Sequence, residues 1–260
     1  MNDVGVVVSR FYEDLKWIEQ LKAPIDVYVY NRQGNSPGMG VHAPLDKDTN
    51  DIGGLDVEVV KNNGVNLTII YIPDDPGFET STYAYHLHSK YDSLNEVTVF
   101  LQAHPMLYIH DIIELLNNPQ QLKYTQFVPQ FPGPGLLPAK RTLLDTPIEF
   151  SYVSNRFAHL APMDGVDYGW TPYMNDYSKA PWLKFCQDIA KEGWPPPPFN
   201  FGEGNQFMVN RKRVWKHPVE YYKELQEFVN THMDPNPTRP PYQQYNQGPN
   251  IIEGIAQFMF

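Results

Sequence analysis

Cysteine and long apolar runs are both scarce in this sequence. The 260 residues contain one cysteine, Cys186, which excludes an intramolecular disulfide and every zinc or iron–sulfur site that needs several cysteines. Nowhere do roughly 18 apolar residues follow one another, as a membrane-spanning helix requires, and the first residues lack the basic region of a signal peptide. We therefore expect a soluble, cytoplasmic protein without a membrane span.

Positive charge is scarce as well. Lysine and arginine number 20 against 30 aspartate and glutamate residues, and the formal net charge is −10 at pH 7. Proteins that bind nucleic acid usually carry a basic surface, so we expect no nucleic-acid partner. Hydrophobic residues make up 42% of the chain and aromatic residues 14%, which is enough for a sizeable core and argues against intrinsic disorder.

The common cofactor motifs are also missing. No GxGxxG follows the first predicted strand, and neither GxxxxGKS nor GxxxxGKT occurs, which disfavours dinucleotide and P-loop cofactors. No two histidines have the spacing of a zinc-binding HExxH. A hydrolase with paired carboxylates has no spacing in its favour either.

The first half of the chain alternates strand and helix patterns. Runs of β-branched or alternating apolar residues predict strands at 4–8, 25–30, 67–72 and 97–102. Apolar residues at helical spacing predict helices at 12–21, 79–94 and 106–116. This alternation is typical of an α/β fold with a mostly parallel central sheet and flanking helices. We predict that 33–65 is a long loop with a strand-like interruption at 57–60.

The second half is irregular and rich in proline. The chain contains 25 prolines, about twice the usual share of ~5%, and many of them fall in 127–138, 195–198 and 235–249. Between 119 and 205 we predict loops with only a strand at 148–153 and a short helix at 182–191. A strand at 207–209 and helices at 218–232 and 251–260 follow. No linker or repeat divides the chain, so we expect one domain over 1–260.

Polar side chains follow each of the four strands predicted in the first half. They are Ser9, Arg10, Glu13 and Asp14 after the first, Asn31 and Arg32 after the second, Asp74 and Asp75 after the third, and Gln102 and His104 after the fourth. Ligands of open α/β sheets bind at the carboxyl ends of the strands. We therefore expect these side chains to converge on one ligand-binding edge.

Two arginines at this edge are suited to a diphosphate. Arg10 and Arg32 are permanently charged donors with a forked geometry that matches phosphate oxygens. For Arg10 an ordinary salt bridge to Glu13 or Asp14 at a helix start is an equally good interpretation.

Carboxylates and one histidine offer further candidates. Asp74 and Asp75 could hold a divalent cation through their oxygens, although the sequence Asp-Asp-Pro-Gly is better explained as a turn before a helix. His86 follows Glu79 by seven residues, which is two helical turns, so both should lie on one helix face.

Three blocks of the sequence resemble a known family. They are residues 6–17 (VVVSRFYEDLKW) with 29–32 (VYNR), residues 77–87 (GFETSTYAYHL) with 91–94 (YDSL) and 97–105 (VTVFLQAHP), and residues 204–214 (GNQFMVNRKRV) with Pro218, Tyr221, Tyr222 and Leu225. These blocks resemble a widespread, poorly characterised eukaryotic and viral family related to GT-A glycosyltransferases. They are more weakly similar to the capsid-glycan glycosyltransferases of large algal viruses, which are soluble enzymes.

The resemblance implies a GT-A-like domain that transfers a sugar from a nucleotide diphosphate sugar to a glycan acceptor, and it leaves the use of Mn²⁺ or Mg²⁺ open. Residues 1–118 would form the nucleotide-sugar half and 119–260 the acceptor half. The nucleotide would be held by Ser9, Arg10, Asn31, Arg32 and Gln102. Either Glu203 or Glu79 would act as the catalytic base. The other expected contacts are His86, Gln206, Arg211 and Glu253 to the substrates, and Asp74, Asp75 and His104 to a metal ion.

The chain departs from the family pattern at three places. The usual Gly-Arg-Glu reads Gly77-Phe78-Glu79, and the C-terminal Glu-x-x-Trp motif is reduced to Glu253. No Asp-x-Asp follows the strand predicted at 97–102. These departures support an alternative hypothesis, a non-catalytic carbohydrate-binding or interaction protein on a degenerate glycosyltransferase scaffold.

Overall fold

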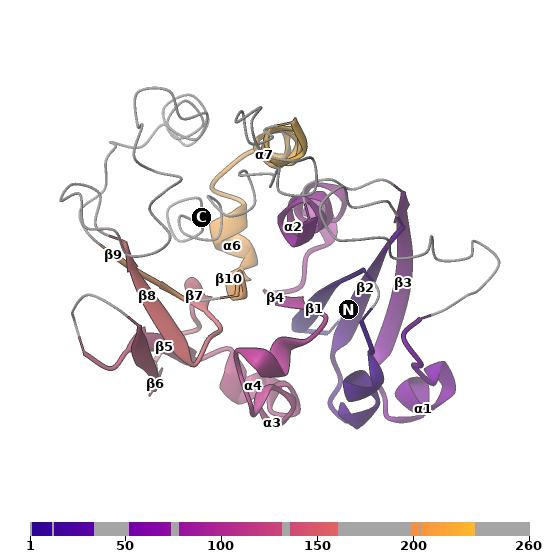
Figure 1. Ribbon diagram of the computed structural model, residues 1–260, viewed down its shortest axis with the longest axis horizontal. Helices are drawn as coiled ribbons and strands as arrows, with labels where there is room; N and C mark the ends of the chain where they lie inside the picture. The colour runs from indigo at the N-terminus through magenta and orange to yellow at the C-terminus, as the bar shows by residue number, and fades with distance from the viewer. Residues whose placement is uncertain are drawn as a thin grey trace, which may run out of the picture.

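A six-stranded sheet forms the centre of the fold (Figure 1). The computed structural model describes residues 2–11, 13–33, 52–73, 78–131, 136–160, 199–202 and 204–231. The strand order is β3-β2-β1-β4-β10-β7. The bounds are β1 Val4–Arg10, β2 Asp26–Gln33, β3 Asn66–Pro73, β4 Val97–Gln102, β7 Phe150–Tyr152 and β10 Phe207–Asn210. β1 to β4 are parallel and β10 is antiparallel to both of its neighbours, which confirms the mostly parallel sheet of an α/β fold.

The central strands are buried on both faces. All seven residues of β1 are buried, as are Val97–Leu101 of β4. Strands with helices on both sides read as continuous apolar runs, because neither face meets water. The run of valines in β1 suits this position, since β-branched side chains pack well on a pleated surface.

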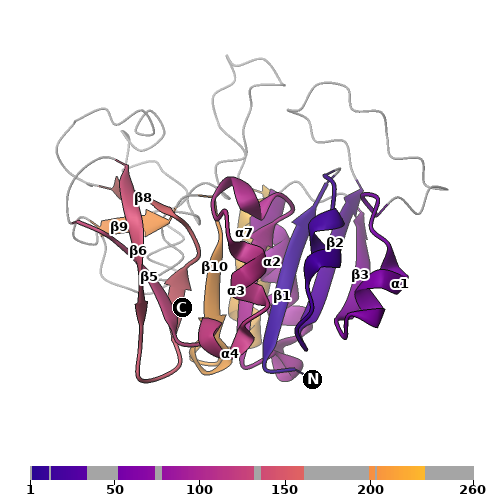
Figure 2. The ribbon, with the colours of Figure 1, turned by 90° about the horizontal axis from the view of Figure 1, so that it is seen from below.

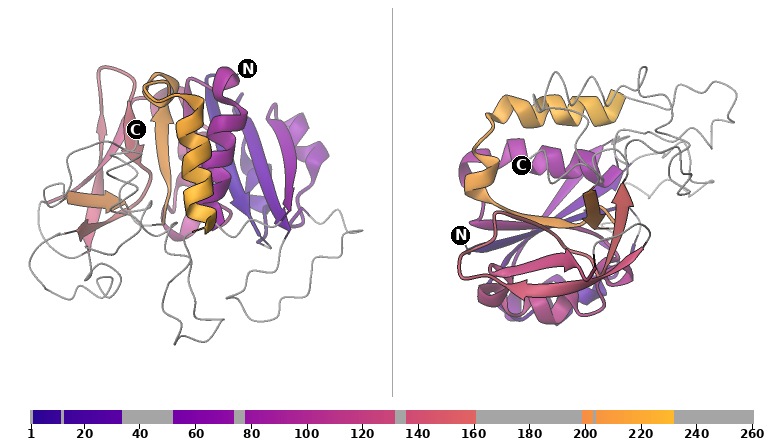
Figure 3. Two further views of the ribbon diagram at one scale, coloured as in Figure 1. Left: turned by 90° about the horizontal axis from the view of Figure 1, so that it is seen from above. Right: turned by 90° about the vertical axis from the view of Figure 1, so that its left-hand side faces the viewer.

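Helices cover both faces of the sheet. α2 (Phe78–Ser89) packs against β1, and α7 (Val219–Thr231) packs on α2 as an outer layer (Figure 3, right). The other face carries the 3₁₀ helix η1 (Lys16–Gln20), α3 (Ile112–Leu116) and α4 (Pro119–Leu122) (Figure 2). α1 (Val57–Asn62) packs against β3 and η1. No helix in the described ranges is long and apolar enough to cross a membrane.

α2 and α7 differ in how they are buried. α2 lies between the sheet and α7, so even its polar residues Thr80, Ser81 and Thr82 are buried. α7 has one buried face, as the helix predicted at 218–232 requires. That face consists of Tyr221, Tyr222, Leu225, Phe228 and Val229.

A second sheet lies beside β7, in the part of the chain where loops are predicted (Figure 1). Its order is β5-β6-β8-β9, and every pair is antiparallel. The strands are β5 Thr125–Pro129, β6 Leu137–Leu143, β8 Arg156–Leu160 and β9 Phe199–Gly202. β6 is not predicted from the sequence, because four consecutive residues, 140–143, are exposed. This removes the alternation of apolar and polar residues that indicates a half-buried strand. The strand predicted at 148–153 is shorter and corresponds to β7.

Several predicted elements differ from the observed ones. The interruption at 57–60 is the start of helix α1, capped by Asp56, whose Oδ1 accepts from the Glu58 and Val59 amides at 3.0 and 3.2 Å. The helix predicted at 12–21 is only η1. That predicted at 79–94 is α2 followed by η2 (Tyr91–Ser93), and that at 106–116 is η3 (Pro105–Leu107) and α3. The helices predicted at 182–191 and 251–260 lie outside the described residues.

Candidate functional site

The strand order reverses between β1 and β4. From β1 the chain continues outward through β2 and β3, and then returns to place β4 on the other side of β1. In open parallel sheets, the carboxyl ends of the strands at such a point leave a crevice where ligands bind. Ser9 is the register partner of Gln102 across this point, and Arg10 is the partner of Asn31. The structure thus brings these predicted nucleotide-binding residues together at one edge.

Hydrogen bonds connect the first turns of α2 to this edge. Ser9 Oγ donates to Thr82 Oγ1 at 3.1 Å, and Gln102 Nε2 donates to Glu79 Oε1 at 2.7 Å. Because these bonds join α2 to β1 and β4, the helix N-terminus faces the switch point. The positive end of the helix dipole there favours a bound anion.

Glu79 has one carboxylate oxygen available at this edge. Its Oε1 accepts from Gln102, whereas its Oε2 makes no hydrogen bond to a residue in the described ranges. Both side chains are half-buried, so a substrate can reach them. A carboxylate held at one oxygen and open at the other is suited to accept a proton.

Arg10 is completely buried and structural. Its Nε donates to the Glu13 carbonyl at 2.7 Å, and its Nη1 donates to Asn31 Oδ1 at 2.7 Å. Gly53 covers it with a positive φ of 68°, and a Cβ at Gly53 would lie 2.5 Å from the Glu13 carbonyl oxygen and 3.0 Å from Arg10 Nε. At 0% exposure, Arg10 is placed to join the ends of β1 and β2, and the diphosphate contact expected of it does not fit this position.

Arg32 is buried without a polar partner among the described residues. It is 8% exposed, and it makes no hydrogen bond or ion pair with any residue that the structure describes, Nε being fully enclosed. Its Cζ lies 5.8 Å from the centre of the Phe11 ring, which is a cation–π approach. An unpaired buried charge is costly, so this guanidinium is suited to receive an anionic ligand.

A left-handed turn brings Gln206 to the same edge. Gly204 and Asn205 have φ angles of 93° and 50°, and Asn205 Nδ2 donates to Thr80 Oγ1 at 2.7 Å. Gln206 precedes Phe207, the register partner of Phe100. Its side chain is 0% exposed, and neither its amide nitrogen nor its amide oxygen has a hydrogen-bond partner among the described residues.

Asn205 and Thr82 also form hydrogen bonds at this edge. The sequence analysis does not name them as site residues. Thr82 lies three residues after Glu79 on the same helix face, a spacing that could have indicated it. The Gly204-Asn205 pair is typical of a turn with positive φ. Neither signal specifies a hydrogen bond to a distant element, because that depends on how α2 docks.

His86 lies in the core and not at this edge. It is 1% exposed, and its Nδ1 is 2.8 Å from the Tyr30 hydroxyl oxygen. Its ring also packs near Tyr28 and Phe100. Burial, assisted by the charge of Lys90, lowers the pKa of His86 to about 3, so the imidazole is neutral. The expected substrate contact does not fit this placement, because α2 turns this position toward the sheet.

Arg211 lies at the opposite edge of the sheet. Its amide donates to the Glu96 carbonyl at 2.8 Å, and its Nη1 donates to the Leu94 carbonyl at 3.1 Å. β10 is antiparallel to β4, so its last residues reach the amino end of β4. Gln206 and Arg211, both expected on the acceptor side, are therefore separated by the length of β10.

The remaining predicted residues are either exposed or outside the described part of the chain. Asp74, Asp75, Glu203 and Glu253 lie outside the described residues. His104 is exposed after β4. Within the described ranges, no group of three His, Cys, Asp or Glu side chains could hold a metal ion.

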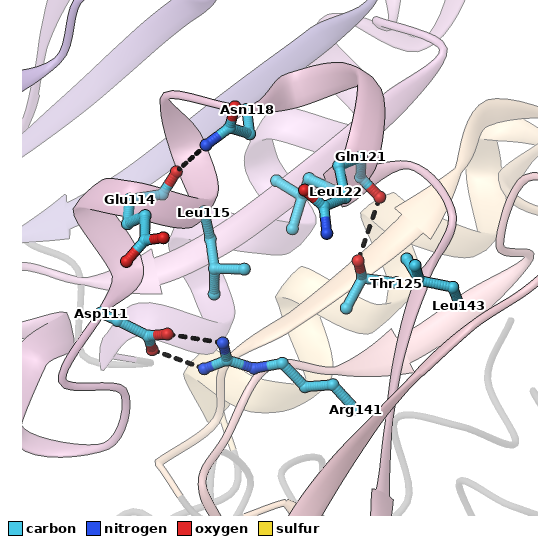
Figure 4. Close-up of a pocket in the computed structure, with 9 residues that line it drawn as sticks. All are labelled: Asp111, Glu114, Leu115, Asn118, Gln121, Leu122, Thr125, Arg141 and Leu143. Carbon is cyan, nitrogen blue, oxygen red and sulfur yellow. Dashed lines mark hydrogen bonds and ion pairs between the residues drawn. The ribbon is translucent and has the colours of Figure 1, made fainter.

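A pocket of about 300 Å³ lies away from the switch point, between α3–α4 and the β5–β6 hairpin (Figure 4). Asp111 and Arg141 form a two-pronged ion pair at one end of it. The hydrogen bond from Arg141 lowers the pKa of Asp111. The third charged lining residue, Glu114, has no ion pair with a residue in the described ranges.

Comparisons with protein families, with curated proteins and with solved structures gave no match to this chain.

Proposed function

We propose that this protein is a glycosyltransferase with a GT-A-like fold, which moves a sugar from a nucleotide diphosphate sugar to a glycan acceptor. The observation that carries the proposal is Arg32, a buried guanidinium without a polar partner among the described residues at the carboxyl edge. The N-terminus of α2 and the Glu79–Gln102 pair at the neighbouring switch point support it. The sequence resemblance supplies the reaction class.

For an inverting transfer, the reaction can be written with this chain's own side chains. The bond between the anomeric carbon and the β-phosphate oxygen breaks, and its electron pair stays on that oxygen. Arg32 stabilises the charge on the leaving diphosphate. The acceptor hydroxyl oxygen bonds to the anomeric carbon, and Glu79 Oε2 takes its proton. Gln102 orients the carboxylate through Oε1, while Ser9 and Asn31 lie beside the nucleotide.

A Mn²⁺ or Mg²⁺ ion would neutralise part of the diphosphate charge. Asp74 and Asp75, the residues best suited by type to hold it, lie outside the described residues. The proposed proton transfer and charge stabilisation therefore use Glu79 and Arg32 alone.

Ligand binding is tested by thermal unfolding with UDP, GDP, ADP and their sugar conjugates, with and without Mn²⁺. A ligand that binds only the folded state raises the stability, by about 2.7 kcal/mol at a concentration 100 times its Kd. We expect one nucleotide class to raise the Tm of the wild type. Arg32→Gln should abolish this shift, whereas Arg156→Gln, which alters an exposed arginine on β8, should retain it.

Catalysis is tested by release of the nucleoside diphosphate in the presence of a glycan panel. Glu79→Gln should keep the nucleotide-dependent shift and lose about 100-fold or more in rate, the usual range for a general base. If no nucleotide raises the Tm while glycans do, the protein is a carbohydrate-binding module and the proposal is wrong.

A further inference from the structure

A short cationic segment stands out in this acidic chain. Residues 211–216 (RKRVWK) contain four of the 20 lysines and arginines, and no acidic residue occurs between 204 and 219. We call residues 211–216 the cationic turn. Such a concentration of one charge on a chain of net charge −10 creates a local positive potential that the net charge conceals.

The fold holds the cationic turn rigidly. It begins with α6 (Arg211–Val214), whose N-cap Asn210 accepts from the Lys212 amide at 2.9 Å. Val214 is buried, and its carbonyl accepts from the Tyr222 hydroxyl at 2.8 Å. These anchors belong to β10 and α7, so the exposed side chains of the turn are presented from fixed positions.

Trp215 presents an apolar ring at the surface of the cationic turn. It is 45% exposed, yet its Nε1 already donates to the Tyr91 carbonyl at 3.0 Å. The Arg211 guanidinium lies 4.9 Å from the ring centre. With its only donor satisfied, the exposed part of the indole can offer apolar contact and no hydrogen bond.

Cations flank this ring and are only weakly neutralised. Lys212 is exposed and has no ion pair among the described residues, while Lys216 has a side chain that is 57% exposed. Among the described residues, the acid that pairs with the turn is Glu149, which is shared by Arg213 and Lys216 at 3.4 Å each. Shared, exposed pairs of this length contribute little to stability, so an anionic surface can compete for these lysines.

The cationic turn lies at the end of the sheet opposite the candidate site. Asn210 is the register partner of Val97 at the amino end of β4, and α6 lies at the same end of the sheet as the N-terminus (Figure 3, left). The site lies at the carboxyl ends of the same strands. A partner bound at the turn would therefore leave the site open.

We propose that the cationic turn docks the protein on membranes that contain acidic phospholipids. A half-exposed indole with its N–H satisfied, between lysines with long aliphatic stems, matches the headgroup region, where tryptophan is enriched and lysine keeps its charge in water. Acidic lipids attract basic segments near their surface, by about fivefold in partition for each lysine. This inference is independent of the proposed glycosyl transfer.

The test is co-sedimentation with vesicles of phosphatidylcholine alone or with about 30% phosphatidylserine. We expect the wild type to sediment with the acidic vesicles and to be released as salt rises to about 0.5 M. Lys212→Glu/Lys216→Glu should weaken this binding at least tenfold, and Trp215→Ala should weaken it severalfold. Lys22→Glu/Lys140→Glu, which changes the net charge equally at two exposed sites, should leave it intact.

Unfolding temperatures within a few degrees of the wild type would show that the variants are folded, and Trp215→Phe replaces Trp215→Ala if the latter is not. Equal binding to both kinds of vesicle, no binding, or equal loss in the control variant would overturn the proposal. Stronger retention on heparin or RNA than on acidic vesicles would also overturn it, in favour of a polyanion partner.

Discussion

The side chains of Arg10 and Arg32 lie at the same edge of the sheet in different surroundings. Arg10 donates to Asn31 and to the Glu13 backbone, so its charge is used within the fold. Arg32 has no such partner among the described residues. Sequence alone treats both as equal candidates, because the difference depends on Gly53, which packs over Arg10 from a distant turn.

Gln206 offers a test of whether a buried group is kept for function. Both of its amide atoms are enclosed without a partner in the described part of the chain, which costs about 1–3 kcal/mol. Gln206→Met keeps the length and removes both polar atoms. We expect the free energy of unfolding in urea to rise by about 1 kcal/mol and the transfer rate to fall at least tenfold.

Gln121→Met, at an exposed position of α4, is the control and should change neither quantity. A Gln206→Met protein that is more stable and fully active would show that the amide has no role in substrate binding.

His86 should make the stability of the protein depend on pH. Its folded pKa of about 3 lies below its unfolded value near 6.5. Below pH 6.5 the unfolded chain binds a proton that the folded protein does not, so stability is lost as the pH falls, by about 1.4 kcal/mol per unit. His86→Asn keeps a polar atom near the Tyr30 hydroxyl and removes the titration.

Unfolding free energies in urea at pH 7.5, 6.0 and 4.5 measure this effect. His86→Asn should be less stable than the wild type at pH 7.5, because it leaves a cavity, and should lose less stability on acidification. His104→Asn, at an exposed histidine, should keep the wild-type slope. Parallel slopes for all three proteins would contradict the prediction.

At the scale of elements, one carboxylate joins the starts of four segments of the sheet. Asp26 on β2 is 5% exposed and accepts from the amides of Asn2, Asn66 and Asn95 at 2.7–3.0 Å. These donors precede β1, begin β3 and precede β4. Asp26→Asn would replace one acceptor oxygen with an NH₂ donor that faces other donors, and we expect it to lower the free energy of unfolding by about 2–4 kcal/mol.

Urea unfolding measures the effect of Asp26→Asn, with Asp145→Asn at an exposed site as the control. A loss below about 0.5 kcal/mol, the usual range for surface changes, would mean that the network does not hold the strands together.

The strands of the first half could be predicted because burial on both faces leaves long apolar runs in the sequence. Val57–Val60 misled the prediction, since β-branched residues favour strands, whereas capping by Asp56 and packing on β3 stabilise a helix there. None of the four strands of the second sheet was predicted, and in β6 exposed residues such as Lys140 and Thr142 give no period of two.

The candidate site also contains residues that could be predicted from the sequence and residues that could not. The positions of Ser9, Asn31 and Gln102 could be predicted because each lies at the carboxyl end of a parallel strand. In open parallel sheets these ends meet at one edge, where ligands bind. Asn205 could not, because its contact with Thr80 depends on a left-handed turn and on the docking of α2. His86 was misplaced because helical spacing gives a shared face but not which layer that face meets.

At the scale of the whole molecule, the two halves of the chain build one sheet. β10 and β7 come from the second half and continue the sheet beside β4, and Phe207 packs on Phe100 with ring centres 4.8 Å apart. α7, also from the second half, covers α2. The fold therefore gives no reason to expect that 1–118 is an independent unit.

We predict that a fragment of residues 1–118 does not fold on its own. Without β10, the buried residues Val99 and Phe100 of β4 would lie at an open edge, and without α7 the outer side of α2 would face water. Exposed apolar strand edges favour aggregation. The fragment should lack a cooperative thermal transition by circular dichroism and should elute as aggregate, whereas the full chain should unfold in one transition. A monomeric fragment with a cooperative transition would show instead that residues 1–118 form a separate domain, to which the second half was added.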